Sequence, residues 1–273
     1  MSENSKIAEH IKKIFSENLN RIFIYDSLNE KSYTYGTFFN HVLIFKNWLE
    51  SHDIKKEDVL CLMINNSIEL IFFYFASILL QIKVVPIDPL KGNQDIDDII
   101  SQIKFKKLIT TIPDANFLDN MVYLDDEIKS KKVKEEIEID DLKLFDNVDY
   151  NKEFLISFTS GSTGIPKGVI HSFLNLYKSS LAFAKRFNFN QNNIFYHNLP
   201  MTYMAGILNQ IFLPFLSQSQ IVIGDRFSIS TAMKFWEKPI KYNVNVFWII
   251  PTILSILIKF DRGYQGIDYA KNK

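Results

Sequence analysis

One segment constrains the fold more than any other, the run TSGSTGIPKG at residues 159–168. It follows an apolar stretch, Phe154–Phe158, whose composition predicts a buried strand. Its glycines let the backbone turn through positive φ, and backbone N–H groups exposed by such a turn form an anion-binding concavity. Lys167 adds a mobile positive charge of the kind that proteins place against phosphates. The segment therefore predicts a phosphate-binding loop after a strand.

Composition agrees with a large folded core and argues against two classes of partner. The chain has 273 residues, is 47% hydrophobic, and balances 31 Lys and Arg against 31 Asp and Glu. A formal net charge of zero lacks the electrostatic footprint of a nucleic-acid binder, so no nucleic-acid partner is expected. The longest apolar run, Leu70–Leu80, is too short to span a bilayer, and Met1–Lys13 does not read as a secretory signal. The only cysteine, Cys61, is predicted to be a core residue in a reducing compartment. We therefore expect a cytoplasmic protein without a membrane span.

Apolar periodicity alternates between strand-like and helix-like segments along most of the chain. The expected strands are residues 21–26, 32–34, 59–64, 83–87, 107–111, 154–158, 169–170, 195–199, 220–223 and 244–249. The expected helices are residues 5–15, 36–51, 68–81, 95–103, 173–185, 207–216, 230–238 and 251–260. Residues 125–149 are rich in charge and are predicted to be a solvated surface connection. The alternation predicts an α/β fold of layered, mixed, largely parallel sheets flanked by helices.

The spacing within the glycine-rich segment separates two kinds of nucleotide loop. The common pattern G-x-x-x-x-G-K-[ST] is not met, because the sixth position counted from Gly161 is Pro166 and Lys167 is followed by Gly168. A P-loop NTPase is therefore disfavoured. On composition alone, a plain surface turn rich in Gly and Ser stays open as an alternative.

The order of residues in this segment resembles the phosphate-binding signature of the adenylate-forming superfamily, which includes acyl-CoA synthetases, adenylation domains of peptide synthetases, and luciferases. Four other segments resemble motifs of the same superfamily: Lys55–Glu69, Val84–Pro89, Leu199–Gly206 and Phe247–Thr252. In the third of these, the family normally has His where Tyr203 stands. The resemblance implies the N-terminal subdomains of the adenylate-forming fold.

The resemblance also implies a reaction and its participants. In the family, a carboxylate attacks the α-phosphate of MgATP to give an acyl adenylate and pyrophosphate, and a thiol such as coenzyme A commonly takes the acyl group. The residues implied to bind ATP are Thr159, Ser160, Gly161, Ser162, Thr163, Gly164 and Lys167, with Lys167 as the catalytic charge partner. The residues implied to line the carboxylate pocket are Tyr203, Met204, Ala205 and Gly206. A solvated loop lysine and a buried aromatic under the sheet are the alternatives for Lys167 and Tyr203.

The five histidines and the cysteine do not form a metal-binding pattern, so no metal site is expected on this chain. Three of them, His10, His41 and His52, are predicted to lie on the surface. Two others, His171 and His197, lie beside the family motifs, and the sequence leaves their roles open. The Mg²⁺ that accompanies ATP is expected to take its protein ligand from outside residues 1–273.

Several motifs that the family places further along are not found in residues 1–273. These are a Tyr-Gly-x-Thr-Glu motif whose Glu helps to hold magnesium, an Asp that binds the ribose, and a small C-terminal domain with a catalytic lysine. We therefore expect residues 1–273 to be the N-terminal part of an AMP-binding (adenylation) domain, with the C-terminal catalytic-lysine domain absent. Such a chain would be a truncated or split carboxylate ligase that works with a polypeptide carrying the missing half. The alternative is a non-catalytic remnant that binds nucleotide weakly or acts only through protein partners.

Overall fold

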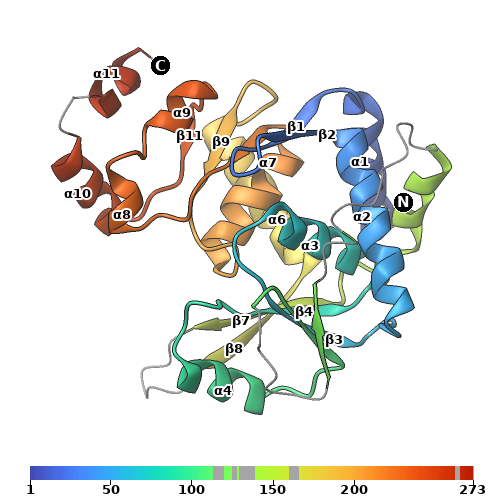
Figure 1. The fold of residues 1–273 in the computed structure, drawn as a ribbon. Helices are drawn as coiled ribbons and strands as arrows, with labels where there is room; N and C mark the ends of the chain where they lie inside the picture. Colours follow the sequence, from blue (N-terminus) through green and yellow to red (C-terminus); the bar gives the residue numbers. More distant parts are fainter. Residues whose placement is uncertain (113–119, 125–127, 129–138, 160–165, 262–264, 273) are drawn as a thin grey trace.

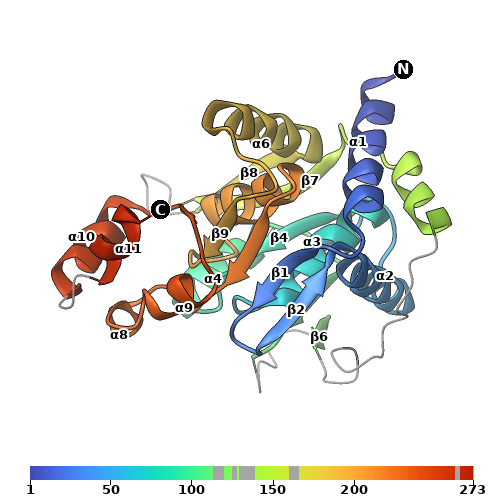
Figure 2. The same cartoon turned by 90° about the horizontal axis from the view of Figure 1, so that it is seen from above.

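Two β-sheets with helices between and around them make up the computed structural model (Figure 1). The structure describes residues 1–112, 120–124, 128, 139–159, 166–261 and 265–272. Within these ranges, one sheet has six strands and the other has five. Helices surround both sheets, as the view from above also shows (Figure 2).

The first sheet has the strand order β6-β5-β3-β4-β7-β8. Its strands are β3 (Val59–Met63), β4 (Lys83–Pro86), β5 (Lys107–Thr110), β6 (Met121–Tyr123), β7 (Glu153–Thr159) and β8 (Lys167–Ser172). All neighbouring strands run parallel except β8, which pairs antiparallel with β7. Helices α3 (Ile68–Leu80) and α4 (Asn93–Ser101) make the crossovers that parallel neighbours require.

The second sheet has the order β11-β9-β10-β1-β2. Its strands are β1 (Ile22–Asp26), β2 (Lys31–Thr34), β9 (Ile194–His197), β10 (Gln220–Ile223) and β11 (Val246–Phe247). Strands β1 and β2 form an antiparallel hairpin, but β1 also pairs in parallel with β10. The pairing continues beyond the strand, where the Ser27 hydroxyl donates to the Ile223 carbonyl oxygen across 196 residues of sequence. The second sheet therefore cannot form from either half of the chain alone.

The helices pack against both sheets. Besides α3 and α4 they are α1 (Glu3–Asn18), α2 (Tyr35–Ser51), η1 (Ile139–Asn147), α6 (Phe173–Phe187), η2 (Ala205–Phe212), α7 (Leu213–Leu216), α8 (Ile229–Ala232), α9 (Glu237–Lys241), α10 (Pro251–Phe260) and α11 (Gln265–Lys271). Among the described residues, no helix has the length and apolar content needed to cross a membrane.

Helix α3 lies between the two sheets, as Figure 1 shows. It is apolar on all sides and buried from Ile68 to Leu79, with only Glu69 half-exposed, as expected for a helix enclosed by a core. Its Phe72 packs against Phe38 of α2, and its Phe75 packs against Phe212 of η2. Burial of each such ring contributes roughly 2–3 kcal/mol. The core around α3 therefore joins the layers of both sheets.

The structure confirms the predicted fold class and most of the predicted elements, but four predictions are wrong in part. Residues 139–149 are not a solvated connection, because η1 buries Phe145 (2% exposed) against Phe15 of α1. The predicted helix at 230–238 is two short helices, α8 and α9. Pro239 has no backbone N–H. It therefore cannot bond to the carbonyl oxygen of Phe235, four residues earlier, as a helix running through both segments would require. Residues 125–127 and 129–138 of the predicted connection lie outside the described residues.

The predicted strand at 244–249 shortens to β11, because the Trp248 carbonyl oxygen turns toward the Gln210 side chain instead of a neighbouring strand. All three histidines predicted on the surface are half-buried: His10 bonds to the Tyr177 hydroxyl at 2.9 Å, the ring of His41 stacks on Phe72, and the ring of His52 packs against Trp48. The short elements β6 and α11 were not predicted. Cys61 is fully buried, as predicted.

Candidate functional site

The candidate site lies where the carboxyl ends of the parallel strands of both sheets meet. The phosphate-loop segment follows β7, the segment Asn198–Gly206 follows β9, and Arg226 follows β10. Asn66 and Asp88 follow β3 and β4 of the first sheet and contact segments of the second sheet. Ligands of open α/β sheets bind at this edge. The fold therefore brings together motifs that are far apart in sequence.

The β7–β8 hairpin holds both ends of the predicted phosphate loop. Thr159 at the end of β7 pairs with Lys167 at the start of β8. Both residues are exposed, and Lys167 makes no ion pair within the described residues. An exposed lysine that pairs in register with a threonine, and has no ion-pair partner among the described residues, suits an anionic ligand. The other predicted ATP-binding residues, Ser160, Gly161, Ser162, Thr163 and Gly164, lie outside the described residues.

His171 lies on β8 of the same hairpin and has a hydrogen-bond partner on β7. Its Nε2 lies 3.1 Å from the Ser157 hydroxyl on the facing strand. Partial burial lowers the pKa of the His171 imidazole. His171 thus bonds across the hairpin rather than standing free at the site.

The segment after β9 is held by side chains from the layer of the first sheet. The Asn66 amide nitrogen donates to the Leu199 carbonyl oxygen at 2.7 Å, and its amide oxygen accepts from the Met201 N–H at 2.8 Å. The Tyr74 hydroxyl of α3 donates to the Met201 carbonyl oxygen, also at 2.8 Å. Burial raises the pKa of Tyr74 well above its ordinary value, so the hydroxyl stays a donor. These three bonds fix the backbone of the segment against the other sheet.

The four predicted pocket residues lie together at the turn into η2. A Cβ at Gly206 would lie 2.1 Å from the Pro200 carbonyl oxygen, so only glycine fits there. Met204 and Ala205 are half-buried, and Tyr203 is 55% exposed. The alternative of a buried aromatic at Tyr203 is therefore wrong. The pocket-lining role of these four residues stays a prediction.

Sequence reasoning missed Gln210, which is fully buried in η2. Its amide oxygen accepts from the Leu199 N–H, and its amide nitrogen donates to the Tyr196 and Trp248 carbonyl oxygens and to Asn198 Oδ1. The four bonds measure 3.1–3.2 Å. η2 is a π-helix, a rare winding that is frequent at functional sites. The sequence signal that could have identified this buried residue is a polar glutamine within the largely apolar segment 207–216.

His197 is also fully buried, at the end of β9. Strand alternation puts it on the same face as Phe195, which packs against Leu213 at the start of α7. Neither ring nitrogen makes a hydrogen bond of ordinary geometry with the described residues, although the nearby Gly206 backbone acts on the pKa in the direction opposite to burial. Loss of solvation therefore dominates and lowers the pKa of His197 to about 3.

The buried His197 predicts a stability that depends on pH. Its folded pKa lies below its ordinary 6.5, so the unfolded chain binds the additional proton between these values. The part of the free energy of unfolding that comes from keeping His197 neutral in the fold is fully present above pH 6.5. It is lost on acidification, by about 1.4 kcal/mol per pH unit. Urea unfolding of the wild type and of His197→Leu from pH 7 to pH 4.5 should show the wild type losing stability more steeply. Parallel curves would contradict this assignment.

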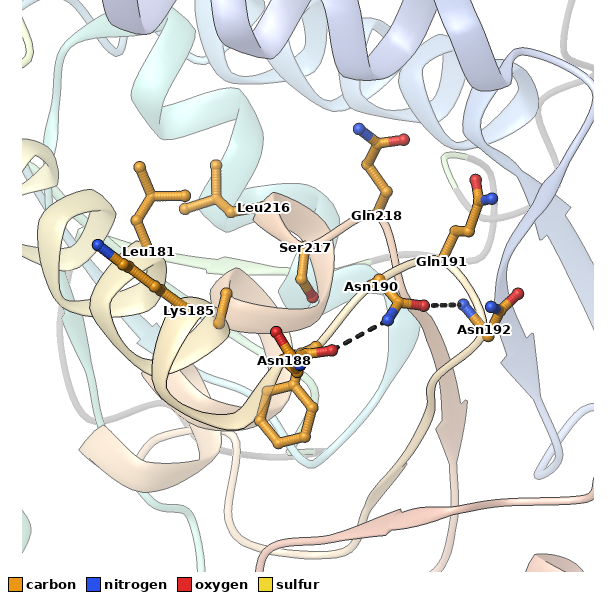
Figure 3. Close-up of a pocket in the computed structure, with 11 residues that line it drawn as sticks. Leu181, Lys185, Asn188, Asn190, Gln191, Asn192, Leu216, Ser217 and Gln218 are labelled. Carbon is orange, nitrogen blue, oxygen red and sulfur yellow. Dashed lines mark hydrogen bonds between the residues drawn. The ribbon is translucent and has the colours of Figure 1, made fainter.

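A hollow of about 680 Å³ lies at the opposite end of the second sheet (Figure 3). Its lining comes from the end of α6 and the turns before β9 and β10: Leu181, Ala184, Lys185, Asn188, Phe189, Asn190, Gln191, Asn192, Leu216, Ser217 and Gln218. Its amides bond within the turn, as between the Asn190 side chain and the backbone of Asn188 and Asn192. The hollow lies at the ends where β9 and β10 begin, whereas the candidate site lies where these strands end. The two are therefore separate.

No group of three His, Cys, Asp or Glu side chains within the described ranges is placed to hold a metal ion. The carboxylate of Asp88, at the site edge, is bound by Arg226. The described residues therefore do not fit a magnesium site by themselves.

A model of the family described as "AMP-binding enzyme" matches residues 13–272. The chain belongs to the AMP-binding enzyme family. Its fold agrees: a solved structure of o-succinylbenzoate CoA synthetase from Bacillus subtilis, in complex with an acyl-adenylate intermediate, superposes with a TM-score of 0.77 at 19% identity. The match covers 92% of this chain and 63% of that enzyme. Another structure of the same B. subtilis enzyme holds ATP and a magnesium ion.

Two curated relatives are also CoA ligases by name. This AMP-binding enzyme is 30% identical over 121 residues to a probable CoA ligase from Humulus lupulus, and 29% identical over 121 residues to a malonate–CoA ligase from Arabidopsis thaliana. Each alignment covers 42% of this chain and 19% of the relative. The chain thus aligns with about a fifth of these relatives and with less than two thirds of the solved enzyme.

Proposed function

We propose that this AMP-binding enzyme chain takes part in ATP-dependent activation of a small carboxylate, which forms an acyl adenylate and pyrophosphate and then a thioester with coenzyme A. The observation that carries the proposal is Lys167, which is exposed, forms no ion pair with any described residue, and pairs in register with Thr159 at the edge where the two sheets meet. Family membership supports the reaction type.

In this proposal the chain binds the phosphates and positions the carboxylate. The carboxylate oxygen attacks the α-phosphorus, and the bond to the pyrophosphate oxygen breaks. The leaving pyrophosphate gains negative charge, which Lys167 and the hydroxyl and N–H groups of residues 159–164 stabilise. Tyr203 and its neighbours 204–206 form one wall of the carboxylate pocket. Asn66, Tyr74 and Gln210 hold Leu199 and Met201, which directly precede that wall.

The remaining parts of the reaction are assigned outside residues 1–273, which we propose to be the N-terminal part of the adenylation domain. The magnesium ligand, the ribose-binding Asp and the catalytic lysine of the family would come from a further polypeptide segment. Relatives named for malonate and o-succinylbenzoate make these two acids the first substrates to test.

ATP–pyrophosphate exchange tests the proposal. The chain is assayed alone and with a polypeptide that carries the Tyr-Gly-x-Thr-Glu motif and the catalytic-lysine domain, with each candidate acid. We expect ATP binding by the chain alone, and acid-dependent exchange only in the combined sample. Absence of exchange in every combination, together with no ATP binding, would favour the non-catalytic alternative and overturn the proposal.

A further inference from the structure

Exposed apolar side chains gather on the last helices of the chain. Fifteen large apolar side chains are exposed among the described residues. Seven of them lie on or beside α8, α9, α10 and α11: Ile229, Met233, Ile240, Ile250, Leu254, Ile258 and Ile267. Exposed apolar side chains that are scattered singly are ordinary, but a group on neighbouring elements marks an interaction site. This concentration therefore indicates a surface that packs against another polypeptide.

Helix α10 carries two apolar stripes that differ in exposure. Ile253 and Leu257 are buried and pack into the apolar core on the second sheet. Ile250, Leu254 and Ile258, each four residues from the next, are 42%, 50% and 71% exposed. Residues at this spacing are neighbours on one face of a helix. The apolar arc of α10 is therefore wider than the part that the described fold covers.

Helix α8 adds apolar surface beside this stripe. It contacts α10, and both helices lie near β11 in Figure 1. Ile229 and Met233, again four residues apart, are 69% and 65% exposed. Helix α8 has no charged residue and α10 has one. We refer to these two side chains together with Ile250, Leu254 and Ile258 as the α8–α10 face.

The second sheet ends at β11, the strand that precedes α10. Strand β11 is the last in the strand order, and its neighbour among the described strands is β9, with which it runs parallel. Parallel neighbours are usually joined through a helix, as β3 and β4 are joined through α3 in the first sheet. Strand β11 followed by α10 therefore has the form of a βαβ unit without its second strand.

Solved structures of this fold contain chain that residues 1–273 do not match. A structure of the N-terminal domain of FACL13 from Mycobacterium tuberculosis superposes with a TM-score of 0.78 at 17% identity. The match covers 94% of this chain but 66% of that one. About a third of that N-terminal domain thus has no counterpart in residues 1–273. Since the unmatched part belongs to an N-terminal domain, it is distinct from a small C-terminal domain.

We propose that the α8–α10 face and the outer edge of β11 are the docking surface for the remaining third of the N-terminal domain, which adds a parallel strand beside β11. Strands buried in parallel sheets are rich in Val, Ile and Leu, so the docking segment is an apolar one of this composition. This inference rests on the part of the proposed function that makes residues 1–273 the N-terminal part of an adenylation domain. An apolar surface with few charges is typical of permanent assemblies.

Thiol labelling tests the position of the docking surface. The only cysteine of the chain, Cys61, is buried, so a cysteine introduced at an exposed site is the one that reacts. Ile258→Cys is labelled with a maleimide in the chain alone and with each of two polypeptides. The longer spans the unmatched third of the N-terminal domain, including the Tyr-Gly-x-Thr-Glu motif, and the shorter is the catalytic-lysine domain alone.

The longer polypeptide should slow the labelling of Ile258→Cys by about ten-fold or more, because thiol reactivity follows exposure. The shorter polypeptide should leave the rate unchanged. Leu28→Cys is the control, since Leu28 is an exposed apolar residue in the turn between β1 and β2. Its labelling rate should stay within about two-fold with either polypeptide.

Leu254→Glu and Ile258→Glu test the contribution of the face to assembly. Both side chains are exposed, so each variant alone should melt within about 2 °C of the wild type. Docking would bury the new carboxylate in an apolar interface, so calorimetry should show binding of the longer polypeptide weakened at least about 100-fold. Leu28→Glu makes the same change away from the face and should stay within about two-fold. MgATP binding by the chain alone should be unchanged in all three variants.

The other possible results would overturn the inference. A defined dimer of the chain alone, in which Ile258→Cys already reacts slowly, would assign the face to a second copy. Slow labelling in a monomer, or a Leu254→Glu chain that melts well below the wild type, would show that the fold already covers the face. Labelling slowed by the catalytic-lysine domain alone would assign the face to that domain.

Failure of the longer polypeptide to bind, or binding that leaves the labelling of Ile258→Cys unchanged, would also overturn the docking surface. The ATP-binding part of the proposed function is judged separately, by MgATP binding to the chain alone. Protection of Ile258→Cys in a chain that binds no ATP would overturn that part and support this inference. ATP binding without protection would overturn this inference alone.

Discussion

Replacing Lys167 with alanine is expected to weaken MgATP binding and to lower ATP–pyrophosphate exchange by about 100-fold. The side chain is the cation at the closing pair of the β7–β8 hairpin, and the described residues offer it no ion-pair partner. Its charge is therefore available to the leaving pyrophosphate. Exchange is measured in the combined sample, and binding is measured on the chain alone.

Two variants serve as controls for Lys167→Ala. Lys185→Ala removes another exposed lysine, which lines the hollow at the opposite end of the second sheet, and should change neither quantity. Lys167→Arg keeps the charge and should retain more binding than Lys167→Ala does. If Lys167→Ala binds ATP as tightly as Lys185→Ala, the lysine is only a solvated loop residue.

Replacing Gln210 with leucine is expected to lower the free energy of unfolding by roughly 3 kcal/mol, because a buried N–H and several carbonyl oxygens lose their partner. For a chain of this size the melting temperature should fall by roughly 6–12 °C. Urea and thermal unfolding measure both quantities. The same variant should also loosen the segment after Leu199, which Gln210 holds from η2.

Gln191→Leu is the matched control, because Gln191 is an exposed glutamine in the turn before β9. It should change stability by less than about 0.5 kcal/mol. Gln210→Glu keeps the shape and one acceptor but loses the donors to Tyr196, Asn198 and Trp248. It should be at least as unstable as Gln210→Leu. A Gln210→Leu protein as stable as Gln191→Leu would show that the buried bonds do not matter.

Local patterns in the sequence were sufficient for the fold class and for the position of the loop. The apolar run before Thr159 predicts β7, and the extended segment predicted at residues 169–170 lies within β8. These features depend on residues that are near one another along the chain.

The contacts that build the candidate site depend on residues that are far apart in sequence. Asn66 and Leu199 are 133 residues apart, and Asp88 and Arg226 are 138 residues apart. Before the fold is known, an aspartate after a strand and an arginine after another strand look like ordinary surface charges. The role of the Gln210 side chain could not be predicted from the sequence either, because most of its partners are backbone groups that become neighbours only in the folded protein.

The parallel pairing of β1 with β10 has a consequence for how the chain is made. The ribosome delivers β1 and β2 first, but the partner strand of β1 emerges 196 residues later, when measured from Ser27 to Ile223. At ordinary elongation rates this interval is roughly 10–40 s. During that time the hairpin presents an open strand edge to other chains. A nascent chain of this family member must therefore keep its first strands from aggregating until β10 has been synthesised.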